Sequence, residues 1–553
     1  MPNRRNFLQT LAIAPCLLHS RPLWAAADGT QAALVIGNAA YAQSGLVNPT
    51  NDAKAMHTLL DKAGFSVDLQ LDASRTAMLE AIERFGKRVQ SSDTKLAVFY
   101  YAGHGAQLDW RNYLLPVNVA VSSATAMKAD CIDLGQVLDH FVKAQRKGAE
   151  KTFVVILDAC RDNPFGITFK PQNKGLSQFD APVGSLLAYA TAPGNVASDG
   201  AGKNGLYTEN LMKELSRPDV RIEDALKRVR LNVRLSSGGE QIPWESTSLE
   251  SDVFIFPHTA PKLSEEELER QIEDEVAHWN RIKTARRAED WIEYLRKFPN
   301  GRFSEIAQAR LNRLLAAQEK RQSPSAAKPK DGGASGELAD LKEGEAFVPA
   351  ETLAAVSHNP YSAGRFPLGR KYTVGDFYIL RNSDLLTGVV ENTFQNRVTR
   401  VDEDNDRVEM NHGKLVFDLM GNTVENNDNK ADVPQQYFPA ELQVGKRWTS
   451  LNNVVMKSGR YTGKTRRVEM DVRIQAREKI RVPAGEFNAF RIEASGWSVG
   501  ESNATKIEVK LWVVPGINVF IRRERIKRRG NRLIESKLTE LVAIRQAASR
   551  LTD

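Results

Sequence analysis

A histidine and a cysteine each follow an apolar run of the chain, and together they could carry out nucleophilic chemistry. Residues 96–101 (LAVFYY) lead into His104, and residues 152–157 (TFVVIL) lead into Cys160. A thiolate is a strong nucleophile, and a neighbouring imidazole can lower the thiol pKa and then protonate a leaving amine. The pair therefore indicates hydrolysis of an amide bond through a cysteine nucleophile.

Strands are needed to bring these two residues together. Six-residue apolar runs rich in β-branched and aromatic side chains are typical of a parallel sheet covered on both faces. Such sheets carry their functional residues at the carboxyl ends of the strands. We therefore expect His104 and Cys160 to lie on one rim of the sheet. Taken singly, Cys160 could be a small buried side chain and His104 a satisfied polar residue, so the joint pattern carries the prediction.

The residues around this pair resemble a peptidase family. YAGHG at residues 101–105 and DACRD at residues 158–162 look like the histidine and cysteine motifs of metacaspases and bacterial caspase-like enzymes. The resemblance covers about residues 30–257 and implies an α/β caspase-like fold, with a mostly parallel sheet flanked by helices. It also implies a cysteine endopeptidase with a protein or peptide substrate. Four further segments share the likeness: 33–38 (ALVIGN), 51–56 (NDAKAM), 186–192 (LLAYATA) and 204–208 (NGLYT).

The resemblance also assigns roles to single residues. It makes His104 and Cys160 the catalytic dyad, and it places the oxyanion hole at the backbone amides of Gly105 and Cys160. Asp52 and Asp158 match two aspartates that line the arginine or lysine pocket of metacaspase-like enzymes. Two carboxylates suit a guanidinium through paired hydrogen bonds, so we expect cleavage after Arg or Lys. The alternative for Asp52 is a helix N-cap.

Departures from the family pattern leave part of the function open. Ala102 stands where those enzymes often carry serine, and Asp162 where histidine is common. The alternatives are an inactive caspase-fold binding or scaffold protein and a cysteine amidase acting on cell-wall peptide. Many metacaspases use calcium, but the sequence offers no ligand set for it, so we expect no required cofactor and no metal ligands. Candidate self-cleavage sites are Arg161, Lys170 and Lys174.

Residues 1–27 are predicted to be a signal peptide. Residues 3–9 (NRRNFLQ) resemble a twin-arginine export signal, an apolar stretch follows at residues 11–18, and residues 25–27 (AAA) offer a cleavage site. The apolar stretch is too short to span a bilayer. We therefore expect a mature protein that begins near Asp28 and is periplasmic or secreted.

Composition is that of a globular protein with two or three domains: 553 residues, 42% hydrophobic and 26% charged. The net charge of +8 falls to +5 without Arg4, Arg5 and Arg21, which argues against nucleic acid as a partner. Only Cys131 and Cys160 remain after processing, so no disulfide framework is expected, although a bridge between them would silence the nucleophile. No internal stretch is typical of a membrane span.

Four regions follow the signal peptide. Alternating strands and helices predict a peptidase domain at residues 28–258. Residues 259–322 are predicted to form a helical hairpin, opened by a capping box at residues 264–267 (SEEE). A Pro/Gly-rich flexible linker is expected at residues 323–337. Period-two patterns at residues 338–553 predict an all-β domain, which we expect to be an antiparallel sandwich or clam.

The β-rich region carries two further signals. VPAGEFNAF at residues 482–490 and WVVPG at residues 512–516 resemble motifs of envelope-associated β-rich domains, so an envelope partner is expected. Residues 522–529 (RRERIKRR) are strongly basic and could hold an anionic partner such as a polyanionic glycan. Protection of an edge strand by charge is the favoured interpretation. Nothing in this region looks catalytic.

Overall fold

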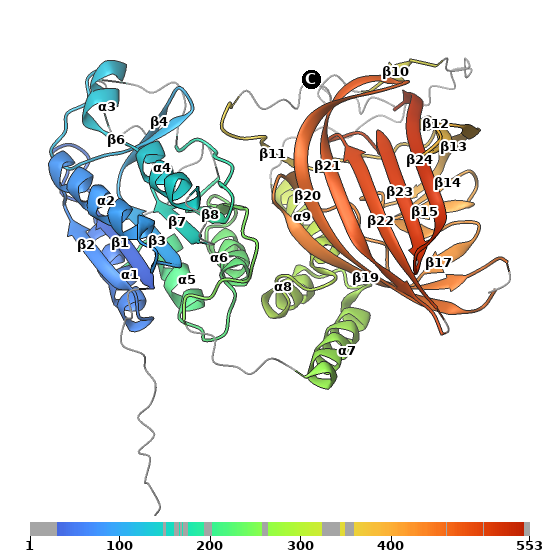
Figure 1. The fold of residues 1–553 in the computed structure, drawn as a ribbon, viewed down its shortest axis with the longest axis horizontal. Coiled ribbons are helices and arrows are strands. Elements are labelled where there is room, and N and C mark those ends of the chain that lie inside the picture. The colour runs from blue at the N-terminus through green and yellow to red at the C-terminus, as the bar shows by residue number, and fades with distance from the viewer. Residues whose placement is uncertain are drawn as a thin grey trace, which may run out of the picture.

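A computed structural model describes the chain in segments. The described residues are 30–146, 151–159, 165, 169, 175–192, 202–256, 264–322, 343–348, 359–459, 462–501 and 503–546. The predicted signal peptide, the predicted linker, Cys160 and the candidate cleavage sites Arg161, Lys170 and Lys174 lie outside these residues. The described residues form an α/β domain, a group of helices and a large β domain (Figure 1).

The α/β domain is built on a mostly parallel sheet, as predicted. Its strands are β1 (Gln31–Gly37), β2 (Ser66–Leu71), β3 (Leu96–Ala102), β7 (Thr152–Asp158), β8 (Ser185–Tyr189) and β9 (Trp244–Thr247). Among the described residues the order is β2-β1-β3-β7-β8-β9, and only the β8–β9 pairing is antiparallel. A smaller antiparallel sheet contains β4 (Gly105–Leu108), β5 (Arg111–Leu114) and β6 (Ile132–Asp133).

Helices cover both faces of the main sheet (Figure 1). They are α1 (Pro49–Lys62), α2 (Arg75–Gln90), α4 (Leu134–Gln145), α5 (Leu206–Leu215) and α6 (Ile222–Ser236), whereas α3 (Ala124–Asp130) packs against the smaller sheet. Neighbouring residues of β3 show the two faces, because successive strand residues point in opposite directions. The Phe99 ring packs near Phe85 of α2, whereas the Tyr100 hydroxyl meets Thr208 of α5. The sheet is therefore shielded from water on each side, as its continuous apolar strands require.

The helical region contains three helices, not the two of the predicted hairpin. They are α7 (Glu265–Ile282), α8 (Ala288–Lys297) and α9 (Ser304–Gln322). The capping box is confirmed, with Ser264 and Glu267 exchanging hydrogen bonds at the start of α7. The prediction of two helices was therefore wrong. The aromatic core is shared between them: Trp279 of α7 stacks on Phe303, the residue before α9, at 4.8 Å and packs beside Trp291 of α8.

The β domain is a single closed sheet, so the expectation of a sandwich or clam is wrong, while its all-β character is confirmed. The sheet closes because β24 pairs with both β12 and β23. Two short strands, β11 and β18, form a separate pair. The strands are β10 (Ala346–Phe347), β11 (Arg365–Pro367), β12 (Phe377–Asp384), β13 (Val390–Asp402), β14 (Arg407–Met410), β15 (Leu415–Phe417), β16 (Thr423–Glu425), β17 (Asn429–Ala431), β18 (Glu441–Gln443), β19 (Arg447–Met456), β20 (Thr465–Val482), β21 (Gly485–Val499), β22 (Ala504–Val513), β23 (Arg522–Arg529) and β24 (Arg532–Arg545).

The β domain covers the edge strand of the α/β sheet. Gln443 Nε2 donates a hydrogen bond to the carbonyl of Glu245 at 2.9 Å. Gly445 lies so close to the carbonyl of Thr247 that a side chain at this position would collide with it. Both acceptors belong to β9, which has β8 on its other side. No helix among the described residues is long and apolar enough to cross a bilayer.

Buried charges join the three parts around a cavity of about 780 Å³. Arg365 donates a hydrogen bond to Glu441, and Arg230 of α6 lies 3.6 Å from the same carboxylate. Lys446 Nζ lies 2.8 Å from Glu305 Oε2 of α9. Removing one partner from such a pair leaves a buried charge uncompensated, which is strongly destabilising. The network therefore favours one arrangement of the three parts.

This network predicts that acid separates the β domain from the α/β domain. Burial raises the pKa of Glu441, but Arg365 and Arg230 outweigh burial and lower it to about 2. A carboxyl whose folded-state pKa is depressed contributes stability above its unfolded pKa, about 4.3, and loses that contribution as the pH falls toward 2. We therefore expect the radius of gyration, measured by small-angle X-ray scattering, to increase over this interval.

A variant tests the same pair without acid. Glu441→Gln should weaken docking at neutral pH, because Arg230 of the α/β domain then faces an amide instead of a carboxylate, and limited proteolysis between the parts should become faster. The matched control is Glu501→Gln, which breaks an exposed pair with Lys464. Equal proteolysis of the Glu441→Gln and wild-type proteins would contradict the assigned role of Glu441.

Candidate functional site

The parallel pairing of β3 and β7 sets the position of the predicted site. Their register places Ala102 beside Asp158, the last residues of the two strands. The amide of Gly103 donates to the carbonyl of Asp158 at 3.3 Å. His104 follows two residues after Ala102, so it leaves the sheet at the rim where β7 ends. Cys160 follows two residues after Asp158 in sequence and lies outside the described residues.

His104 is buried, with 4% of its surface exposed, and its surroundings fix the ring. Nε2 lies 2.7 Å from the carbonyl oxygen of Ser44, and the ring packs 4.5 Å from the ring of Tyr41. A carbonyl can only accept a hydrogen bond, so Nε2 carries the proton. In the neutral imidazole Nδ1 is then the basic nitrogen, as a general base requires.

Two tyrosines hold the backbone of His104. Its amide donates to the Tyr41 hydroxyl at 3.0 Å, and its carbonyl accepts from the Tyr101 hydroxyl at 2.7 Å. The two hydroxyls lie 3.2 Å apart, and each lies 3.1 Å from the carbonyl oxygen of Leu115, to which the Tyr41 hydroxyl donates. Burial raises the pKa of Tyr41 and Tyr101 above the usual tyrosine value, so both stay protonated.

Sequence reasoning missed the residues that position the imidazole. Tyr41 and Ser44 lie in the connection between β1 and α1, far from His104 in the chain. Asp72 ties this connection down by accepting hydrogen bonds from the amides of Ala39 and Ala40 at 2.8 and 2.9 Å. One feature of the sequence could have indicated these residues. The connection starts at the carboxyl end of β1, and this end lies on the same rim of the sheet as His104.

Gly105 lies directly against the residue that precedes Cys160. A methyl group built on Gly105 would come within 3.3 Å of Ala159 Cβ and 2.9 Å of Leu176 Cδ2. The second contact is tighter than a real Cβ tolerates, so the position favours glycine. The residue after His104 and the residue before Cys160 are therefore close neighbours.

The structure brings both predicted pocket aspartates to the start of α5. Asp158 Oδ2 accepts a hydrogen bond from Thr208 Oγ1 at 2.7 Å. Asp52 Oδ1 accepts from the amide of Gly205 at 3.0 Å and from Asn204 Nδ2 at 2.8 Å. Both aspartates are buried. Residues from β7 and α1 thus contact the same turn, although they are far apart in sequence.

Both carboxylates affect the pKa of the Tyr100 hydroxyl. This hydroxyl is 2.7 Å from Thr208 Oγ1, the hydroxyl that also contacts Asp158. Burial raises the pKa of Tyr100 well above its usual value, and the charges of Asp158 and Asp52 raise it further. Two buried carboxylates therefore lie near this hydroxyl.

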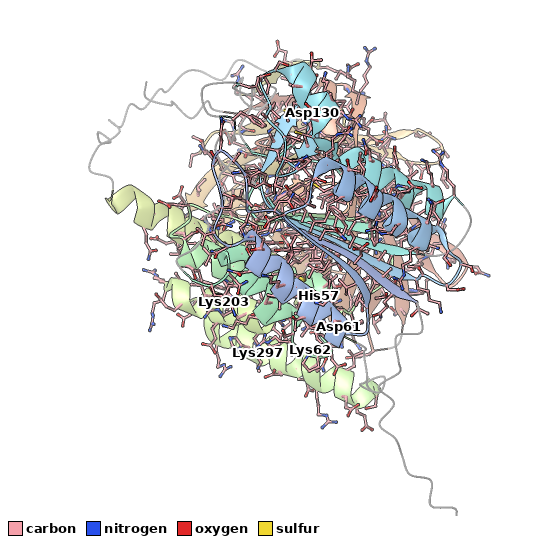
Figure 2. All side chains as sticks on the ribbon, turned by 90° about the vertical axis from the view of Figure 1, so that its left-hand side faces the viewer. His57, Asp61, Lys62, Asp130, Lys203 and Lys297 are labelled. Atoms are coloured by element: carbon pink, nitrogen blue, oxygen red, sulfur yellow. The ribbon has the colours of Figure 1, made fainter. Side chains whose placement is uncertain are left out.

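Asp52 does not cap its own helix. The N-cap of α1 is Asn48, and Asp52 lies one turn later, from where it reaches α5. Figure 2 shows α1 from the side, with His57, Asp61 and Lys62 labelled toward its other end. The contact with Gly205 still has a structural role, because it gives the Gly205 amide, at the start of α5, a hydrogen-bond acceptor.

The basic segment in the β domain lies on a central strand. β23 pairs with β22 and with β24, so the interpretation that its charges protect an edge strand is wrong. Many of its cations have carboxylate partners: Arg522 contacts Glu524, while Arg525 and Lys527 contact Glu535. An anionic partner of this segment stays a prediction.

No possible metal site was found among the described residues. They contain no group of three or more His, Cys, Asp or Glu side chains arranged to hold a metal ion. The use of calcium, which the sequence resemblance raised, is therefore a question for an activity assay.

A match to a protein family supports a caspase-like fold for part of the chain. The family model described as Peptidase_C14, caspase domain, matches residues 30–254. The crystal structure of caspase-1 from Spodoptera frugiperda is similar with a TM-score of 0.32 and 14% sequence identity, covering 42% of this chain and 92% of that chain. No curated protein sequence matches the chain. Residues 30–254 are thus a caspase-like α/β domain, followed by an all-β domain.

The burial of Cys131 predicts that its thiol is unreactive. Only 3% of Cys131 is exposed, and burial raises the pKa of its thiol to about 12. The reactive thiolate is therefore almost absent at neutral pH. We expect iodoacetamide to alkylate Cys160 of the mature protein at neutral pH while leaving Cys131 unmodified, as measured by peptide mass mapping. Equal labelling of the two cysteines would show that Cys131 is accessible.

Proposed function

We propose that this protein is a cysteine endopeptidase in which Cys160 is the nucleophile and His104 its proton partner. The observation that carries the proposal is the setting of His104, whose ring is fixed by Ser44 with Nδ1 as the basic nitrogen. The closeness of Gly105 to Ala159 supports it, because Gly105 follows His104 in the chain and Ala159 precedes Cys160. The match of residues 30–254 to the caspase domain agrees with this chemistry.

In the proposed reaction, His104 Nδ1 takes the thiol proton and Cys160 Sγ attacks the scissile carbonyl carbon. The carbonyl oxygen becomes an oxyanion, which the amides of Gly105 and Cys160 stabilise by hydrogen bonds. Collapse of this intermediate breaks the C–N bond, and His104 gives its proton to the leaving amine. Water then attacks the thioester with His104 as base, releasing the carboxylic acid and restoring the thiol.

We also propose that the enzyme cuts after arginine or lysine. Asp52 and Asp158 lie together at the start of α5, and their charges converge on Tyr100. A guanidinium or ammonium entering this region would gain attraction from both carboxylates. An aspartate side chain would be repelled and would also lose its hydration. Charge sign therefore separates this specificity from that of enzymes that cut after aspartate.

The proposed site of action is the bacterial envelope or the medium outside the cell. The support is the sequence of residues 3–9, which resembles a twin-arginine signal, together with the cleavage site at residues 25–27. The substrate would then be a protein or peptide of that compartment.

Substitution of the dyad tests the proposed activity. Cys160→Ala should abolish cleavage of fluorogenic peptides, because a methyl group cannot attack a carbonyl. His104→Ala should lower kcat by roughly 10²–10⁴-fold, because proton transfer is lost. Matched controls are Cys131→Ala and His57→Ala, the latter on the outer part of α1 (Figure 2). A fully active Cys160→Ala protein would exclude a cysteine peptidase and favour a binding function.

Substitution of the pocket aspartates tests the specificity. Loss of one partner from a buried, hydrogen-bonded charge pair typically costs about 2–5 kcal/mol, so Asp158→Asn should lower kcat/KM for arginine peptides roughly 30-fold or more. Asp52→Asn should do the same if it faces the substrate. If Asp52 serves only the start of α5, its variant should instead lose about 0.5–2 kcal/mol of stability with kcat/KM nearly unchanged.

Kinetics and melting curves on the same variants separate these outcomes. Asp61→Asn is the matched control, because Asp61 is an exposed carboxylate on the same helix as Asp52 (Figure 2). Each assay is run with and without calcium on peptides that end in arginine, lysine or aspartate. A preference for aspartate peptides would overturn the pocket assignment while leaving the dyad in place.

A further inference from the structure

Four hairpins of the closed sheet turn at the same end of the β domain. They join β12 to β13, β19 to β20, β21 to β22 and β23 to β24, and the antiparallel registers align their turns. The opposite end carries β10 and the turn between β20 and β21 (Figure 1). We name the first end the hairpin rim. It comprises the described residues of 384–390, 455–465, 497–504 and 528–534.

The hairpin rim exposes large apolar side chains. More than half of the exposed large apolar side chains in the described part of the chain lie on it. Leu386 is 70% exposed and Val389 nearly as much, Trp497 projects from β21, and Leu533 and Ile534 begin β24. Exposed large apolar side chains concentrated at one end of a domain are a feature of interaction sites. The rim is therefore a candidate interaction surface.

The apolar residues lie on both faces of the hairpins. Leu533 and Ile534 are consecutive residues of one strand, and both are exposed. Val389 and Val390, at the start of β13, are also consecutive and exposed. Successive strand residues point to opposite faces. A partner packed against one face would cover only one member of each pair, whereas a medium that surrounds the turn covers both.

Among the described rim residues, the charges without an ion pair are those of Arg529, Arg532 and Asp384, and the Asp384 carboxylate accepts hydrogen bonds from the amides of Leu386 and Thr387. Arg529 and Arg532 lie directly opposite each other across the β23–β24 hairpin. Neither forms an ion pair with any residue that the structure describes, and like charges in this position destabilise a hairpin. The acidic Glu501, by contrast, is paired with Lys464. An anion beside the two arginines would remove their repulsion.

We propose that the hairpin rim docks this protein on an anionic lipid surface. The apolar turns would insert shallowly among the acyl chains, and Trp497 would lie at the headgroup level, where tryptophan is favoured. Arg529 and Arg532 would bind headgroup phosphates, for which a guanidinium is well suited. This inference goes beyond the peptidase activity and does not depend on it, because the rim lies on a different domain from His104.

Vesicle binding by the full mature protein tests the proposal. We expect it to co-sediment with vesicles of phosphatidylglycerol mixed with phosphatidylcholine, and at least about tenfold more weakly with phosphatidylcholine alone. Replacing Leu386, Val389, Leu533 and Ile534 together by serine should weaken binding at least about tenfold, because their insertion is lost. Trp497→Phe should remove part of the blue shift in tryptophan fluorescence that binding causes.

Matched variants at the other end of the β domain control for nonspecific effects. Val374→Ser removes a 61% exposed apolar side chain outside the rim and should bind as the wild type does. Arg529→Gln/Arg532→Gln should weaken binding to anionic vesicles, whereas Lys479→Gln/Arg481→Gln, which removes the same charge from the opposite end, should not. Unchanged circular dichroism shows that the rim variants are folded.

Three results would overturn the proposal. The first is no binding to anionic vesicles, and the second is equal binding by the rim variants and the wild type. The third is a wild-type self-association, seen by analytical ultracentrifugation, that the serine variant abolishes without any vesicle binding, since the rim would then bind a second copy of the chain. Cleavage of a soluble peptide by the same variants reports the proposed peptidase activity separately.

Discussion

The parallel register of β3 and β7 is the constraint on which the candidate site depends. Pairing Ala102 with Asp158 means that the two strands end together, so whatever follows them must share one rim. A shift of one residue would turn every side chain of a strand to the opposite face. The apolar residues of both strands prevent that shift, because they are buried under helices on each side. The core thus positions His104 without contributing any chemistry.

The local patterns predicted the strands and helices well, but not the contacts between distant segments. The continuous apolar runs identified β3 and β7. Tyr41 and Ser44 could not be predicted as neighbours of His104, because their role arises only when the connection after β1 folds over the rim. No sequence pattern near His104 indicates its contacts with Tyr41 and Ser44.

The errors in the β domain share one physical cause. Period-two patterns show that a segment is a strand, but they do not show which strand it pairs with. Closure depends on the pairing of β12 with β24, which stand at the beginning and end of the domain. The same pairing of β24 with β23 makes the basic segment central instead of an edge. A pattern read one strand at a time therefore suggested two stacked sheets and an exposed edge.

The cover over β9 has a consequence for how this protein behaves in concentrated solution. An open sheet edge presents unpaired amides and carbonyls that another molecule can extend into a longer sheet. Here Gln443 and Gly445 occupy that edge and belong to the same chain. A tethered segment competes at an effective concentration on the order of millimolar, which exceeds that of free protein in most settings. The β9 edge of the caspase-like sheet is therefore shielded from edge-to-edge pairing by a segment that dilution cannot remove, while β2 forms the other edge of that sheet.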